Sequence, residues 1–263
     1  MKASGRAIPI LNPARASRRL RGRDVKVIGL GGIGVPVAQG LAQFFYRLPA
    51  PPRLFLIDGD AFEEANRDRV VFYSEPGHNK AKVKAQELTL LCGGGVSILP
   101  VPRFVTPRNA SRLIAGGDIL FLCVDNHATR KLVAGRCRRL PSVTLFSGGN
   151  DGVENGRPGT YGNVQIYERV RGRDRFNPIT RFHPEIAKPA DHRPDELGCA
   201  ALLQSVPQLL FTNLAVAAAM LGAFHNWLCG NLPYEEVCLD IALARMNPIT
   251  RAVAAGRNRG GRR

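Results

Sequence analysis

An α/β fold with a doubly wound, mostly parallel sheet is predicted by two features of the 263-residue chain. Short apolar runs alternate with segments of helical periodicity through residue 146, the order that builds a parallel sheet covered by helices. The first run ends in the glycine cluster Gly29-Leu-Gly31-Gly32-Ile33-Gly34. A strand that turns into a helix through such a cluster presents backbone N–H groups to an anion. A Rossmann-like nucleotide site is therefore expected at this turn.

The helices and strands of the first half are predicted from apolar runs and from the residues that end them. Buried strands are expected over residues 25–30, 53–57, 96–100, 118–124 and 143–146, because these runs are apolar and end at glycine, proline or acidic residues. Helices are expected over residues 35–46, 78–91 and from Asn126 to about residue 140. The segment 61–72 is polar and is expected to be a loop.

The pattern changes in the second half of the chain. Residues 162–168 alternate like a half-exposed strand, and residues 170–198 are rich in Arg, Pro and His without a period, which predicts an irregular crossover segment. Residues 199–228 lack charge and are expected to form a long buried helix, followed by a last edge strand over 236–243. We therefore expect a basic N-terminal arm (1–23), one domain (24–250, its nucleotide half 24–150 and its C-terminal half 151–250) and a basic tail (251–263).

Net charge and cysteine usage indicate which partners the protein can bind and in which compartment it is expected. The formal net charge is +16, and part of it lies in the two terminal segments, which could hold nucleic acid or an acidic protein. The six cysteines form no Cys-x-x-Cys pair, and no signal-peptide core precedes the first strand, so a reduced, cytoplasmic protein is expected. The uncharged stretch 199–234 contains many polar residues, which favours burial within a protein over a membrane span.

Spaced polar residues after the glycines distinguish this chain from a generic nucleotide-binding protein. Asp58 and Asp60 follow the second strand, close to the usual place of a ribose-binding acid. The motifs Asn66-x-x-Arg69, Lys80-x-Lys82 and Asp125-Asn126-x-x-x-Arg130 come next. Together with the glycines, these motifs resemble the nucleotide signature of the ThiF/MoeB and ubiquitin-activating-enzyme superfamily, over residues 24–150 and more weakly to about 245. Stand-alone ThiF proteins of bacterial plasmid-borne (PRTRC-type) systems are the most similar group.

The resemblance implies an ATP-dependent adenylyltransferase that activates the C-terminal carboxylate of a small ubiquitin-like or sulfur-carrier protein and releases pyrophosphate. Asp58 would bind the ribose hydroxyls, and Asp60 would also belong to the nucleotide site. Asn66, Arg69 and Lys80 would surround the phosphates, and Asp125 would hold Mg²⁺. Cations around the phosphates suit this chemistry, because one anion must attack another. Arg69, Lys80 and Asp125 would be the catalytic groups, and Gly29, Gly31, Gly32 and Gly34 would complete the nucleotide site.

Three further expectations come from the same resemblance. Relatives often hold zinc with two Cys-x-x-Cys pairs, and without such pairs no zinc site is expected here. Cys199 occupies the place where relatives carry a thioester- or persulfide-forming cysteine, and an inert packing role is the alternative. Homodimers of the family use a basic residue of the N-terminal arm at the partner's phosphates, for which Arg15, Arg18 and Arg19 are the candidates.

Other functions stay open on the sequence. A relative that adenylates a tRNA base would explain the positive charge. An NAD-dependent oxidoreductase would explain the glycines and Asp58 but not Asn66, Arg69, Lys80 or Asp125. A catalytically silent scaffold subunit is the non-enzymatic alternative, and loss of ATP binding would identify it.

Overall fold

The fold is a single sheet with helices on both faces, seen in a computed structural model that describes residues 11–72, 74, 76–154, 156–196 and 207–250. The strand order is β11-β10-β8-β5-β4-β1-β2-β3, and β9 pairs with β8. Five neighbouring strands are parallel: β1 (Val25–Ile28), β2 (Leu54–Ile57), β3 (Ile98–Val101), β4 (Ile119–Leu122) and β5 (Val143–Asn150). The predicted Rossmann-like α/β class is confirmed.

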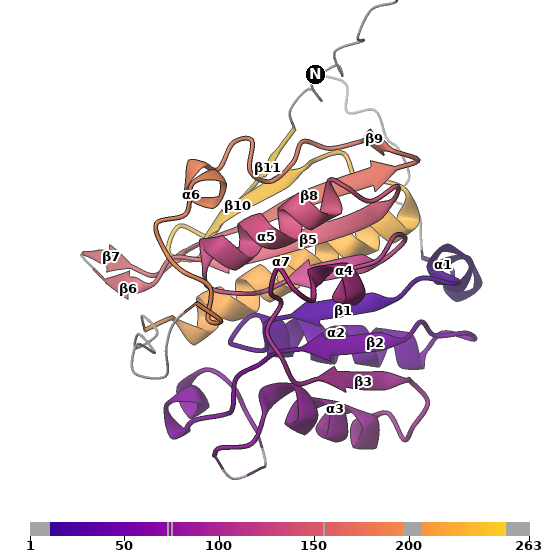
Figure 1. Cartoon of the computed structure of the whole chain (residues 1–263), viewed down its shortest axis with the longest axis horizontal. Coiled ribbons are helices and arrows are strands. Elements are labelled where there is room, and N and C mark those ends of the chain that lie inside the picture. The colour runs from indigo at the N-terminus through magenta and orange to yellow at the C-terminus, as the bar shows by residue number, and fades with distance from the viewer. Residues whose placement is uncertain (1–10, 73, 75, 155, 197–206, 251–263) are drawn as a thin grey trace, which may run out of the picture.

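The parallel strands are apolar throughout because helices cover both of their faces. In β4, Ile119 and Phe121 pack into one core, while Leu120 and Leu122 pack into the core on the opposite face. The first core lies under α2 (Gly34–Tyr46), α3 (Lys80–Leu91) and α7 (Leu210–Cys229). The second lies under α4 (Ala110–Leu113), α5 (His127–Cys137) and α6 (Pro184–Ala187). Figure 1 shows α5 in front of the sheet and α7 behind it.

The carboxyl ends of the parallel strands meet at one edge, where the loops that follow β1, β2 and β4 come together. A short 3-10 helix, η1 (Glu64–Asp68), lies within the segment expected to be a loop. The crossover segment contains little regular structure beyond β9 (Arg173–Asp174) and α6, as its composition predicted.

Two strand predictions in the second half need correction. β8 (Tyr161–Val170) is not half exposed: β5 and β10 flank it, α7 covers one face, and Ile179 and Ile186 of the crossover segment lie in the core on the other. β10 (Glu236–Asp240) is not the edge strand either, because β11 (Arg245–Ile249) pairs with it. The small strands β6 (Val153–Glu154) and β7 (Arg157–Pro158) form a separate hairpin.

The expectation that residues 1–23 form an arm outside the core is wrong for residues 13–20. They form α1 (Pro13–Leu20), which begins at Pro13 after the Asn12 cap and buries Ala16, Ser17 and Leu20. The Arg19 guanidinium lies 4.3 Å from the centre of the Trp227 ring on α7. This stacking and the small apolar face of α1 fix the segment to the domain.

The long helix starts later than predicted. Residues 207–209 are not helical, Leu209 is extended, and α7 runs from Leu210 to Cys229. Residues 199–206 of the expected helix lie outside the described residues. No helix in the described part of the chain is long and apolar enough to cross a membrane; α7 instead packs on β5 and β8.

Candidate nucleotide-binding site

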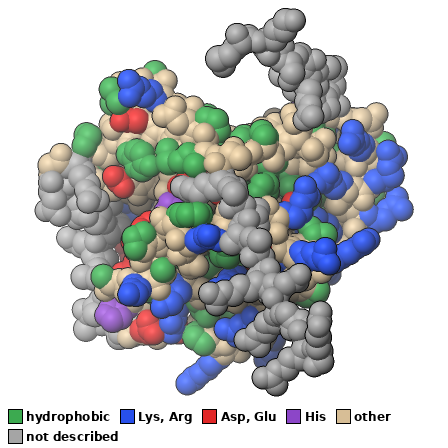
Figure 2. Space-filling view, turned by 90° about the horizontal axis from the view of Figure 1, so that it is seen from above, with side chains coloured by type: hydrophobic (Ala, Val, Ile, Leu, Met, Phe, Trp, Pro, Cys, Tyr) green, Lys and Arg blue, Asp and Glu red, His purple; other side chains and the backbone are tan. Residues whose placement is uncertain are grey.

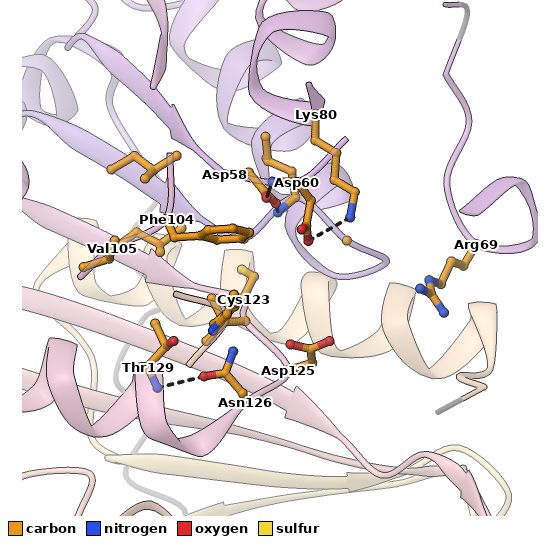
Figure 3. A pocket seen from close by; sticks show the side chains of 17 residues that line it. Asp58, Asp60, Arg69, Lys80, Phe104, Val105, Cys123, Asp125, Asn126 and Thr129 are labelled. Carbon is orange, nitrogen blue, oxygen red and sulfur yellow. Dashed lines mark hydrogen bonds and ion pairs between the residues drawn. The ribbon is translucent and has the colours of Figure 1, made fainter. Parts of the chain in front are cut away.

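A hollow of about 100 Å³ that opens to solvent lies where the strand ends meet. Its walls come from the loops after β1, β2, β3 and β4, with Arg69 beyond η1, Lys80 at the start of α3 and Pro194 from the crossover segment. Figure 3 shows Asp58, Asp60 and Lys80 along one side and Asp125 and Asn126 along the other. Residues far apart in the sequence thus form one site at the carboxyl edge of the sheet.

The glycine turn fits between β1 and β4 only because side chains are missing. A Cβ on Gly34 would lie 1.8 Å from the Gly29 carbonyl oxygen, and Gly29 itself has φ +89° against the Cys123 backbone. A Cβ on Gly31 would meet no atom within 4 Å, and Gly31 lines the hollow. Gly29 and Gly31 therefore shape the hollow, whereas Gly34 lets α2 approach the strand, as predicted.

The start of α2 is open for an anion. Its N-cap is Ile33, whose side chain accepts no hydrogen bond, and its first turn contains no acidic residue. The Val35 N–H donates to the Gly31 carbonyl at 3.1 Å and Pro36 has no N–H, so an anion here would meet the backbone N–H groups that precede Val35. The dipole of α2 favours a negative acceptor at that place. The turn therefore has the chemistry of a phosphate site.

Gly32, like Gly34, is not among the residues that line the hollow, and its contact with a nucleotide stays a prediction. It packs on Asn213 of α7, whose amide nitrogen would lie 2.1 Å from a Cβ at position 32. Asn213 is fully buried, and neither polar atom of its side chain has a hydrogen-bond partner among the described residues. This amide lies directly behind the phosphate turn, a contact that the sequence did not indicate.

Asp58 holds the glycine turn from the end of β2. Its Oδ2 accepts a hydrogen bond of 2.6 Å from the Leu30 N–H, and its Oδ1 accepts one of 2.8 Å from the Asp60 N–H. Burial raises the pKa of Asp58 to about 6, although the nearby Lys80 opposes the shift. Each carboxylate oxygen can accept a second hydrogen bond, so the side chain keeps capacity for a ligand hydroxyl.

Lys80 is aimed at the hollow by its neighbour Asn79. The Asn79 side chain caps α3 at Lys82 N and donates to the carbonyls of Asp58 and Asp60 at 3.0 and 2.9 Å. The Lys80 Nζ then lies 3.3 Å from an Asp60 carboxylate oxygen. Figure 3 shows Arg69 on the far side of the hollow from Phe104 and Val105.

Asn66 is not among the residues that line the hollow, so its phosphate contact stays a prediction. It is buried in η1, where its Oδ1 accepts a hydrogen bond of 3.1 Å from the Glu63 N–H. This bond caps the short helix that leads to Arg69. The role visible for Asn66 is to shape the loop rather than to contact a ligand.

Asp125 is exposed after β4, and the helix behind it is fixed by two caps. Asn126 accepts from Thr129 N at 2.8 Å, and Asp191 of the crossover segment accepts from His127 N at 2.6 Å and Ala128 N at 2.8 Å. The backbone N–H groups of residues 127–129, at the start of α5, therefore already donate to side chains of this protein. The crossover segment is tied to the site at this point.

A second hollow of about 490 Å³ adjoins the first, and Asp125 lines both. Arg130 lines the second hollow, is almost fully buried, and donates to Ser147 Oγ at 2.7 Å and to the Gly148 carbonyl at 2.6 Å. Burial lowers the pKa of this guanidinium. Arg130 also donates to the Val124 carbonyl, so it joins the ends of β4 and β5 and supports the backbone that carries Asp125.

Some site residues were missed from the sequence, and one predicted residue lies outside the described part. Phe104 lines the hollow and packs on Gly59; its place just after β3 was the available signal. The sequence gives no signal for Asp191 and Pro194, because they lie in a segment without periodicity. Cys199 lies outside the described residues. Among the described residues, Cys92, Cys123, Cys137 and Cys229 are buried and belong to no disulfide.

The fold and this site define a Rossmann-like protein with a glycine turn that lines a hollow at the carboxyl ends of its strands. Residues 6–207 match the model of the ThiF family, which is more than half of the chain, and the protein belongs to that family. This confirms the predicted superfamily.

Similar proteins with curated names include the adenylyltransferase and sulfurtransferase MOCS3 of Mus musculus and of Xenopus laevis. They are 36% identical over 125 residues and 38% identical over 121 residues, which is 47% and 45% of this chain. Each match covers 26% of the relative, so the chain spans about a quarter of those proteins.

Among solved structures, E. coli MccB with AMPCPP and MccA has a TM-score of 0.65 at 16% identity, over 91% of this chain and 68% of that one. E. coli MccB with ATP has a TM-score of 0.64 at 16% identity, over 91% and 67%. At this identity the likeness supports the fold.

Proposed function

We propose that the protein uses ATP to adenylate the C-terminal carboxylate of a small ubiquitin-like or sulfur-carrier protein and releases pyrophosphate. The observation that carries the proposal is the placement of Lys80, Arg69 and Asp125 around one hollow that the glycine turn closes. Membership of the ThiF family and the similarity to MOCS3 adenylyltransferases support it.

ATP fits the donor set of the hollow. The uncapped start of α2 and the open space at Gly31 suit phosphate oxygens, and Asp58 can accept a ribose hydroxyl. Lys80 and Arg69 supply positive charge for the phosphates, and the Phe104 ring offers an apolar wall for a base. Asp125 is an exposed carboxylate that can hold Mg²⁺, which would neutralise charge on the phosphate oxygens.

The chain's own residues would act by position and charge. A carboxylate that attacks the α-phosphate brings two anions together, and Lys80 and Arg69 reduce that repulsion and stabilise the departing pyrophosphate. The second hollow reaches Asp125 from the other side, so a polypeptide end lying there would approach the phosphates at this residue. Arg130 holds this part of the second hollow in place through its hydrogen bonds to Ser147 and Gly148 of β5.

The site favours this reaction over the alternatives. An NAD-dependent oxidoreductase needs no cation pair around a triphosphate, and a silent scaffold needs no charged groups that converge on a hollow. A tRNA-base adenylyltransferase would use the same nucleotide groups and remains the second enzymatic candidate, favoured by the net charge of +16.

A homodimer, in which the N-terminal region of one subunit reaches the partner's phosphates, is part of the proposal. Within its own chain α1 lies at the opposite end of the strands from the hollow (Figure 1). Arg19 is already stacked on Trp227, whereas Arg15 and Arg18 are exposed. Arg15 and Arg18 are thus the remaining candidates for this role. A dimer and a cytoplasmic location both follow the family expectation.

Nucleotide preference tests the proposal first. Titration of the protein with MgATP and with NAD, followed by calorimetry, should give heat of binding for ATP and none for NAD. Lys80→Ala should abolish the ATP signal, while Lys82→Ala, a nearby exposed lysine on the same helix, should not. Tight NAD binding that is insensitive to Lys80→Ala would contradict the proposal.

The Cys199 thiol, if it captures the acyl group, would act after adenylation, so Cys199→Ala should keep pyrophosphate exchange.

A further inference from the structure

Exposed arginines gather at the edge of the sheet opposite the hollow, on the ends of elements that begin or finish there. Figure 2 shows Lys and Arg side chains concentrated on the side of the molecule where α1 and β9 lie in Figure 1. We define the basic face as the exposed arginines of α1 and the loop after it, of the end of α5, and of the β8–β9 turn: Arg15, Arg18, Arg21, Arg138, Arg139, Arg171 and Arg173.

Backbone hydrogen bonds join these segments into one surface. The Gly172 N–H donates to the Pro141 carbonyl at 2.7 Å, and the Arg171 N–H donates to Ser142 Oγ at 3.1 Å, so the β8–β9 turn lies against the end of α5. The Gly117 N–H donates to the Ser142 carbonyl, and the Arg23 side chain donates to the Gly117 carbonyl at 2.6 Å. The loop after α1 is thereby tied to the same place.

The carboxylates near this surface are already paired with other cations. Asp24 pairs with Arg53, Asp118 with Lys26, Asp174 with Arg169, and Glu168 with Arg175. Within the described ranges, none of the arginines of the basic face forms a salt bridge. Their positive charge is therefore directed to solvent without local compensation.

We propose that the basic face binds the phosphate backbone of a double-helical nucleic acid, independently of the C-terminal tail 251–263. Arginine forks match phosphate oxygens in geometry, and a row of them spread over several loops suits a repeating polyanion better than one small anion. A double helix fits better than a single strand, because stacking on bases needs exposed aromatic rings. The exposed aromatics among the described residues, Tyr46, Tyr161, Phe182 and Phe211, lie in other segments.

A membrane surface is a poorer match to the same charge. Binding in the lipid interface requires an apolar helix face that can insert next to the basic residues. The apolar residues of α1, Ala16 and Leu20, are buried in the core instead. The basic face therefore offers charge without an inserting surface.

Fluorescence anisotropy with a labelled DNA duplex, from 50 to 200 mM NaCl, tests the proposal on the full chain. The face variant carries Arg138→Gln, Arg139→Gln, Arg171→Gln and Arg173→Gln. The control variant removes the same charge elsewhere with Lys82→Gln, Arg108→Gln, Lys131→Gln and Arg245→Gln, all exposed residues outside the basic face. A third variant ends at residue 250, and circular dichroism checks that each variant is folded.

Wild type should bind with an affinity that falls steeply with salt, because each phosphate contact contributes about 0.9 to the slope of log K against log salt. The face variant should lose about 3 to 4 from that slope and at least tenfold in affinity at 100 mM salt, while the control variant and the truncated chain keep most of both. Affinity and slope unchanged in the face variant would overturn the proposal. So would a loss confined to the truncated chain, or single-stranded DNA of equal length binding as tightly as the duplex.

Discussion

Gly31 and Gly34 lie three residues apart in the same turn, yet the structure predicts opposite consequences for replacing each by alanine. The Cβ of alanine at position 34 would lie 1.8 Å from the Gly29 carbonyl oxygen, whereas an ordinary contact needs at least 3.4 Å. The start of α2 would have to move by about 1.6 Å relative to β1 to relieve this clash. A shift of that size in a close-packed core costs several kcal/mol.

The methyl group of alanine at position 31 would instead extend into the hollow without meeting any atom within 4 Å. Gly31→Ala should leave the free energy of unfolding within about 1 kcal/mol of wild type. It should weaken ATP binding by at least tenfold, because the methyl group occupies space where a phosphate would approach the backbone.

Urea denaturation and calorimetric titration with ATP separate the two effects. Gly34→Ala should lose stability by more than about 3 kcal/mol or fail to fold, and Gly31→Ala should lose only affinity. If Gly34→Ala is as stable as wild type, or if Gly31→Ala is destabilised as much as Gly34→Ala, the packing described for the turn is wrong.

Three further predictions concern single side chains of the site. Lys80→Ala and Asp125→Ala should each slow adenylation by a factor of about 10²–10³. The melting temperature should change little, because the Lys80–Asp60 ion pair is partly exposed. A rate within about threefold of wild type would mean that the replaced residue does not have the proposed role. Asp58 has a folded-state pKa of about 6, above its ordinary value of 3.8, so its contribution to stability is present below pH 3.8 and is lost as the pH rises through 6. The difference in unfolding free energy between wild type and Asp58→Asn should therefore fall by up to about 3 kcal/mol between about pH 4 and 7. A flat or rising difference would contradict the burial of this carboxylate. Asn213→Leu replaces a buried amide that has no hydrogen-bond partner among the described residues by an apolar group of similar size, so the unfolding free energy should rise by about 1 kcal/mol. A loss of more than about 1 kcal/mol would mean that the amide has a partner.

The strands of the nucleotide half were predictable because both faces of a central parallel strand are buried, which makes the apolar run continuous. Leu54–Ile57 and Ile119–Leu122 show this plainly. The site residues Asp58 and Asp125 were predictable for a related reason: each follows directly on such a run, and strand carboxyl ends share one edge. Lys80 needed the resemblance to the family, since a lysine at the start of a helix is common.

The errors have equally specific causes. α1 is only eight residues long, and its buried face consists of Ala16, Ser17 and Leu20, so the sequence offers little apolar surface as a signal of packing. β11 is exposed along most of its length and is specified by pairing with β10 rather than by an apolar pattern. Asn213 and Asp191 reach the site from distant segments, and only the tertiary packing brings them there.

The most direct measurement of the proposed reaction is exchange of labelled pyrophosphate into ATP in the presence of a carrier. Small proteins that end in Gly-Gly and are encoded next to this chain are the carriers to test, each as the free carboxylate and as the C-terminal carboxamide. The proposal predicts MgATP-dependent exchange with the carboxylate, none with the carboxamide, none without carrier, and loss of the signal in Lys80→Ala. Exchange that proceeds equally with the carboxamide or without any carrier would contradict adenylation of a carrier's C-terminus.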